Sequence, residues 1–90
     1  MSEGEGFEVT VRTDGGDSAV VHASGDMQVR GFIAEAAAKL YPQSGASPDE
    51  YSLSVNGTKF QPVDWAGKTV DELGITASAK VILIAPAPKG

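Results

Sequence analysis

The sequence predicts an α+β domain of two layers, in which a mixed sheet of four to five strands packs against one α-helix. Three observations predict this class. Several short runs alternate apolar and polar residues, one longer stretch carries apolar residues at helical spacing, and turn-forming residues separate these segments. The length of 90 residues suits one domain, and hydrophobic residues form 41% of the chain, which is enough for one small core.

The first two strands are expected to form a hairpin. Residues 7–12 alternate apolar and polar side chains, as half-buried strands do. A glycine-containing turn over residues 13–17 leads to a second strand over residues 18–24. In that strand Val20 and His22 share one face, and Ala19, Val21 and Ala23 share the other.

Apolar residues at helical spacing between Val29 and Leu40 predict the single long helix. Asp26 is expected to cap its start, because a carboxylate there accepts hydrogen bonds from the free amides of the first turn. Pro42 is expected to end it, because the residue before a proline avoids the helical conformation.

A second hairpin is expected after a loop over residues 43–50. Residues 51–55 alternate like a strand, and Asn56-Gly57 is a strong hairpin signal. A short partner strand is expected over residues 58–61, and Pro62 either ends it or places it at an edge of the sheet.

The final segment predicts a capped turn and a central strand. Thr69 and Glu72 have the spacing of a capping box, and Gly74 closes the short helical turn that follows. Residues 80–84 are apolar on both faces, so this strand is expected in the middle of the sheet beside the first strand. This order of elements is that of a β-grasp domain.

Composition excludes several classes of function. Seven Lys and Arg against twelve Asp and Glu give a net charge of −5, which argues against nucleic acid and anionic membranes as partners. The chain has no cysteine and one histidine, so we expect no metal site and no cofactor. The longest apolar run, residues 81–85, is far shorter than the roughly 20 residues that cross a bilayer. A cytoplasmic protein, monomeric on its own, is the expectation.

The chain divides into three parts. Residues 1–6 are expected to be a flexible acidic N-terminal segment, residues 7–85 the folded domain, and residues 86–90 an extended tail that contains prolines.

Candidate catalytic groups are sparse, and we expect no enzyme. Gly67-Lys68-Thr69 has the end of a phosphate-binding loop, but that motif needs a glycine where Pro62 stands. His22 has no nucleophile or orienting partner at a useful spacing. Trp65 is expected to be a core plug, with an exposed binding aromatic as the alternative.

The layout resembles ubiquitin-like proteins from Phe7 to Gly90. Residues 7–16 are similar to the opening strand and turn of ubiquitin, 53–57 to its third strand and turn, and 67–75 to the segment before its last strand. From Ile75 onward the register runs without a gap, so Gly90 falls on the conjugating terminal glycine. The resemblance therefore implies a ubiquitin-like β-grasp domain.

Departures from ubiquitin imply a divergent, bacterial relative with dedicated partners. The positions that match the main recognition patch of ubiquitin are Asp14, Ser54 and Ile84, and two of these are polar, so ordinary ubiquitin receptors are not expected to bind. Lys89 replaces the penultimate glycine, so the eukaryotic activating machinery is expected to read this tail poorly.

The tail is expected to be a recognition strip for partner enzymes, and its residues are Ala85, Pro86, Ala87, Pro88 and Lys89. Prolines favour polyproline II at about 3.1 Å per residue, so six residues extend roughly 19 Å. Such a narrow strip suits a catalytic channel, where the carboxylate of Gly90 would be adenylated. The alternative is that the prolines only stop the last strand and that Gly90 has no role.

The outward face of the sheet is expected to offer a possible binding surface, made of Val20, His22, Ser54, Ile82 and Ile84. Ile82 and Ile84 lie two apart on one strand face, which favours binding. Scattered apolar exposure without a role is the alternative.

Three functions follow from the resemblance. The first is a covalent protein modifier, which activating and conjugating enzymes join to target amines through Gly90 and which an isopeptidase releases. The second is a non-covalent ubiquitin-like binding module, for example an accessory of a secretion system. The third is a sulfur carrier with a terminal thiocarboxylate, which Lys89 in place of a second glycine disfavours.

Overall fold

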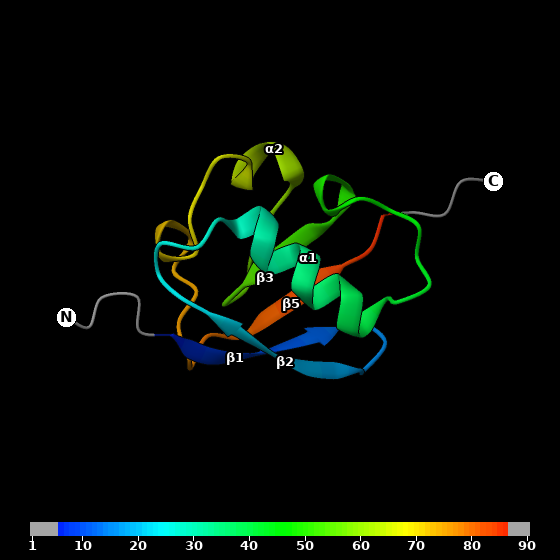
Figure 1. Ribbon diagram of the computed structural model, residues 1–90, viewed down its shortest axis with the longest axis horizontal. Coiled ribbons are helices and arrows are strands. Elements are labelled where there is room, and N and C mark those ends of the chain that lie inside the picture. The colour runs from blue at the N-terminus through cyan, green and yellow to red at the C-terminus, as the bar shows by residue number, and fades with distance from the viewer. Residues whose placement is uncertain (1–5, 87–90) are drawn as a thin grey trace.

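The computed structural model describes residues 6–86 of the chain. Over this range the chain forms a five-stranded mixed sheet, and one long helix packs across one of its faces (Figure 1). The expected two-layer α+β class is confirmed. Of the segment expected at residues 1–6 only Gly6 is described, and tail residues 87–90 lie outside the described residues.

Seven helices and strands and two single turns of 3₁₀ helix are formed within residues 6–86. They are β1 (Phe7–Thr13), β2 (Ser18–Ala23), α1 (Val29–Leu40), a 3₁₀ turn (Pro48–Glu50), β3 (Ser52–Val55), β4 (Thr58–Phe60), α2 (Pro62–Trp65), a second 3₁₀ turn (Asp71–Leu73) and β5 (Val81–Ile84).

The strand order in the sheet is β2-β1-β5-β3-β4. β5 lies in the centre, parallel to β1 and antiparallel to β3, as its apolar character predicts. β2 and β4 form the two edges, so the edge position, one of the two alternatives for the strand before Pro62, is also confirmed.

The core lies between the sheet and α1. Alternate residues of β1, β2, β3 and β5 face the helix and are buried, and the helix contributes the apolar stripe that its spacing predicts. The side chains with 0% exposure are Val9, Val11 and Val21 from the first hairpin, Leu53 and Leu83 from β3 and β5, Val29, Phe32, Ile33 and Ala36 from α1, and Val70.

The expected cap at Asp26 is wrong. α1 begins at Val29 with Gln28 as its N-cap residue, and no side chain caps it. The amide of Val29 donates instead to the backbone carbonyl of Lys68 at 3.0 Å, and Asp26 accepts a hydrogen bond from Ser24 Oγ. A distant backbone segment therefore satisfies a helix amide that sequence reasoning assigned to a neighbouring side chain.

Two further details differ from the sequence expectation. Pro62 does more than end a strand, because it is the first residue of α2, where a proline lacks only an amide that has no helical partner. Residues 43–50 are not all loop: Ser47 and Glu50 form a capping box around the first 3₁₀ turn.

Candidate functional site

The outward face of the sheet, opposite α1, carries a row of paired side chains. Arg12 in β1 faces Ser18 in β2 on one side and Ile82 in β5 on the other. Ser54 in β3 likewise lies between Ile82 and Lys59 of β4. The row therefore crosses all five strands, with a half-buried isoleucine at its middle and a cation toward each side.

A hollow lies beside this isoleucine. Its volume is about 290 Å³, and it is lined by Arg12, Lys80, Val81 and Ile82. Among residues 6–86 the one ion pair joins Arg30 to Asp49, at 2.8 Å. Arg12, Lys59 and Lys80 are exposed and have no ion pair with any described residue. We call these three residues the basic triad.

The structure divides the predicted binding surface into two groups. Ser54 faces Ile82 directly, and Ile84 lies in the next outward row of β5, opposite Ser52. Val20 and His22 lie on β2, separated from β5 by the outward side chains of β1 and by about 10 Å across the sheet. The first three residues are neighbours, and the two on β2 are not part of their cluster.

The two β2 residues have different surroundings. Val20 is 46% exposed and faces Thr10 across the hairpin. His22 is exposed and faces Glu8, and the backbone of Gly6 packs so closely over its ring that a side chain on Gly6 would overlap it.

The first residues after β5 continue from the central strand. Ala85 and Pro86 follow β5 and are half-buried, and Tyr41 at the end of α1 donates its hydroxyl hydrogen to the carbonyl of Leu83 at 3.4 Å. The expected recognition residues Ala87, Pro88 and Lys89, and the expected conjugation residue Gly90, lie outside the described residues.

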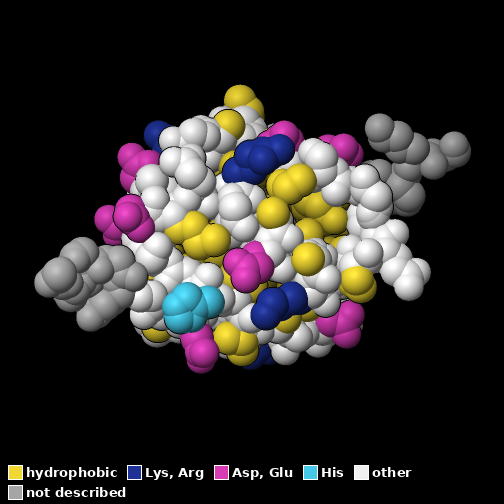
Figure 2. Space-filling model, in the orientation of Figure 1, with side chains coloured by type: hydrophobic (Ala, Val, Ile, Leu, Met, Phe, Trp, Pro, Cys, Tyr) yellow, Lys and Arg dark blue, Asp and Glu magenta, His cyan; other side chains and the backbone are white. Residues whose placement is uncertain are grey.

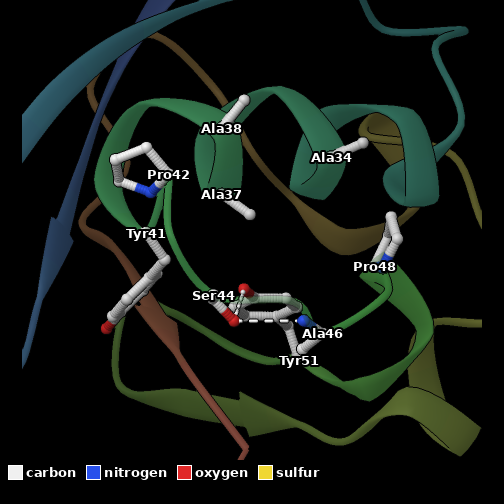
Figure 3. Close-up of a pocket in the computed structure, with 9 residues that line it drawn as sticks. All are labelled: Ala34, Ala37, Ala38, Tyr41, Pro42, Ser44, Ala46, Pro48 and Tyr51. Carbon is white, nitrogen blue, oxygen red and sulfur yellow. Dashed lines mark hydrogen bonds between the residues drawn. The ribbon is translucent and has the colours of Figure 1, made fainter.

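A groove lies on the other side of the molecule, between α1 and the segment after it (Figure 3). Its volume is about 370 Å³, and it is lined by Ala34, Ala37, Ala38, Tyr41, Pro42, Ser44, Ala46, Pro48 and Tyr51. The space-filling view shows hydrophobic side chains gathered on this side of the helix (Figure 2). Ser44 Oγ links residues that line the groove, because it accepts hydrogen bonds from Tyr51 Oη at 3.0 Å and from the backbone amide of Ala46 at 3.2 Å.

The segment that resembles a phosphate-binding loop has a structural role, because its residues form hydrogen bonds within the fold. The carbonyl of Lys68 accepts from Val29, and Thr69 and Glu72 form the predicted capping box, with the Thr69 amide donating to Glu72 Oε1 at 2.8 Å. This backbone hydrogen bond lowers the pKa of Glu72. Trp65 is the predicted core plug: it is 2% exposed and donates from Nε1 to the carbonyl of Tyr51 at 3.0 Å.

No three His, Asp or Glu side chains within residues 6–86 gather as a set of metal ligands. Nor does any helix in the same range have the length and apolar character that crossing a bilayer requires.

The basic triad is what sequence reasoning missed. A signal for it was present, because Arg12 and Lys59 occupy polar positions of alternating strands and so belong to the outward face. The alignment of β1 with β4 through β5 was needed to place them in one row, since these strands lie far apart in the sequence.

Comparisons with known proteins support the fold and nothing finer. No protein-family model matches the chain, and no curated protein sequence matches it. One similar solved structure is a protein designed de novo on the basis of ubiquitin, with a TM-score of 0.66 and 22% identity, covering 96% of this chain and 95% of that one. Another is a computationally designed protein with human erythrocytic ubiquitin as template, with a TM-score of 0.69 and 23% identity, covering 93% of this chain and 96% of that one.

Identity at this level shows the fold alone. The chain therefore has a ubiquitin-like β-grasp fold, as its sequence predicts.

Proposed function

We propose that this chain is a protein-recognition domain that docks a partner protein on the outward face of its sheet. The observation that carries the proposal is the basic triad around Ile82, with Ile84 in the adjoining row. An apolar centre with charged groups at its margin is the composition of a specific protein interface.

The positive charge of this face indicates the charge that a partner surface should carry. The whole chain carries a net charge of −5, yet the triad places three unpaired cations on one face. Because complementary potentials steer and orient a partner, we expect a partner surface with an apolar anchor between carboxylates.

Matched double variants test this proposal. Arg12→Ser with Lys80→Ser removes the two cations of the hollow, and Lys39→Ser with Lys68→Ser removes two cations elsewhere and gives the same net charge. Partners captured by tagged wild-type chain are identified by mass spectrometry, and their affinities for the purified variants are then measured. We expect the first variant to bind about fivefold to thirtyfold more weakly, since two charge contacts together are worth roughly 1–2 kcal/mol.

Two results would contradict the proposal. One is an equal loss of affinity in both variants, which would indicate a general charge effect. The other is unchanged affinity in the Arg12→Ser, Lys80→Ser variant, which would place the contact elsewhere.

The covalent modifier remains a second candidate, as a divergent and bacterial member of the ubiquitin-like class. It is favoured by the course of the chain after β5, since the central strand leads directly into Ala85 and Pro86, with Gly90 four residues beyond Pro86 in the sequence. Conjugation would require Gly90 to carry a free carboxylate, which a partner enzyme adenylates before a target amine displaces the adenylate.

Intact mass of candidate targets distinguishes the two candidates. A modifier predicts an adduct after incubation with the activating and conjugating enzymes encoded nearby, and no adduct when Gly90 is deleted. A recognition domain predicts that deletion of residues 85–90 leaves partner affinity unchanged.

A further inference from the structure

The turn between β3 and β4 carries a chemically reactive pair of residues. Asn56 and Gly57 both have left-handed backbones, with φ values of 52° and 91°. Both are exposed, and no atom lies within 4 Å of the place where a side chain on Gly57 would be. The turn type that joins two strands in two residues requires such backbones, which is why asparagine and glycine stand here.

Asparagine followed by glycine can rearrange without an enzyme. The backbone nitrogen of the glycine attacks the side-chain amide carbon and forms a carbon–nitrogen bond. The bond from that carbon to the side-chain NH2 group breaks, and this group leaves as ammonia with the proton that the glycine nitrogen loses. Water then opens the cyclic imide at either carbonyl, which gives aspartate or isoaspartate. A glycine favours the attack because it has no side chain to hinder its nitrogen.

The fold holds Asn56 away from this reaction. Its side-chain Oδ1 accepts a hydrogen bond from the backbone amide of Lys80 at 2.9 Å. Its backbone amide donates to the backbone carbonyl of Lys80 at 2.8 Å. These two bonds extend the β3–β5 ladder by one step beyond the Val55–Val81 pair. The side-chain carbonyl group must leave Lys80 before its carbon can turn toward the nitrogen of Gly57.

We propose that Asn56 is a spontaneous modification site, and that opening of its two hydrogen bonds to Lys80 gates its conversion to aspartate or isoaspartate. Conversion replaces a neutral amide by a carboxylate next to Lys80, a member of the basic triad. Any effect of this charge change on partner docking rests on the proposed function. The conversion itself, and its control by the two hydrogen bonds, do not.

Intact mass spectrometry of the full chain tests the proposal. The chain is incubated at one mildly alkaline pH and one temperature, in native buffer and in urea that unfolds it. Asn56 is the only asparagine in the sequence, and an amide-to-acid exchange shows as a small mass gain. Peptide mapping distinguishes Asn56 from the three glutamines and separates aspartate from isoaspartate. The Asn56→Gln chain is the control, because its longer side chain closes a larger ring more slowly.

We expect conversion at least about tenfold faster in urea than in native buffer, since the net worth of one hydrogen bond already changes an opening equilibrium by nearly this factor. Equal conversion rates in the two solutions would contradict the claim that the two hydrogen bonds to Lys80 slow the reaction. Absence of conversion in urea, or an equal mass gain in the Asn56→Gln chain, would overturn the site. None of these measurements uses a partner, so their outcome is independent of the docking proposal.

Discussion

Trp65 shows how one side chain joins two parts of the chain. Its indole is buried and donates to the carbonyl of Tyr51, so α2 is held against the start of β3. The sequence allowed either a core plug or an exposed aromatic at this position. The structure confirms the plug, and the hydrogen bond explains how the polar end of the ring tolerates burial.

Trp65→Phe should lower the free energy of unfolding by about 1–3 kcal/mol, because it leaves the carbonyl of Tyr51 without its donor and removes packed ring atoms. Urea unfolding followed by far-ultraviolet circular dichroism measures the change, since the variant lacks the tryptophan fluorophore. An unchanged urea midpoint would mean that the hydrogen bond and the packing contribute nothing net.

Tyr41 links the end of α1 to the strand that leads into the tail. Its hydroxyl donates to the carbonyl of Leu83, and burial, together with the charge of Asp14, raises its pKa. A raised pKa means that the folded state binds the proton more tightly than the unfolded state. The stabilisation is therefore present below the unfolded value of about 10 and is lost as pH rises through the folded value.

Tyr41→Phe should remove part of this alkaline sensitivity. We expect the melting temperatures of the wild type and the variant to run parallel from about pH 8 to about pH 9, and that of the wild type to fall more steeply above about pH 10. Differential scanning calorimetry across this range checks it. Parallel curves for the two proteins would show that the hydroxyl of Tyr41 does not titrate differently on folding.

At the scale of elements, the two predicted caps had different outcomes. The capping box of Thr69 and Glu72 is formed as the sequence predicts, because its partners lie three residues apart in one turn. The cap at Asp26 is absent, because backbone from residues 68–70 docks on residues 27–29 and takes its place. Local patterns locate a cap only where no distant segment competes for the same amides.

A matched pair of alanine substitutions tests this difference. Thr69→Ala should cost about 1 kcal/mol of stability, since it removes the acceptor for the amide of Glu72. Asp26→Ala should stay within about 0.5 kcal/mol of the wild type, because Asp26 bonds only the exposed Ser24 hydroxyl. Chemical denaturation of both variants measures the two losses of stability. An equal loss in the two variants, or a larger loss in Asp26→Ala, would contradict this prediction.

At the scale of the whole molecule, stability depends on one core shared by α1 and the sheet. A domain of this size has a free energy of unfolding of roughly 5–10 kcal/mol. Phe32 lies in the first turn of α1 and is fully buried, whereas Val63 on α2 is 81% exposed. These two apolar residues therefore contribute very differently to the same fold.

Phe32→Ala should cost about 3–5 kcal/mol, a large part of the total stability, through lost burial and a cavity under the helix. Val63→Ala should change stability by less than about 0.5 kcal/mol, because its side chain is already in water. Thermal melts of both variants provide the comparison. A similar effect of the two substitutions would argue against a single core.

The sequence predicted the fold through features that act over a few residues. Alternation in residues 7–12, helical spacing from Val29 to Leu40 and the Asn56-Gly57 turn each depend on near neighbours, and all three are formed as expected. The central place of β5 was also predictable, since a strand that is apolar on both faces needs cover on both sides.

The candidate site depended on the tertiary structure. Arg12, Lys59 and Lys80 come from three distant parts of the chain, and only the pairing of β1, β5, β3 and β4 places them around Ile82. The same pairing separates Val20 and His22 from Ser54, although all of them belong to one face. Periodicity determines which face a side chain occupies, because it follows from local backbone geometry; strand order determines which side chains are neighbours, because it follows from how the whole core packs.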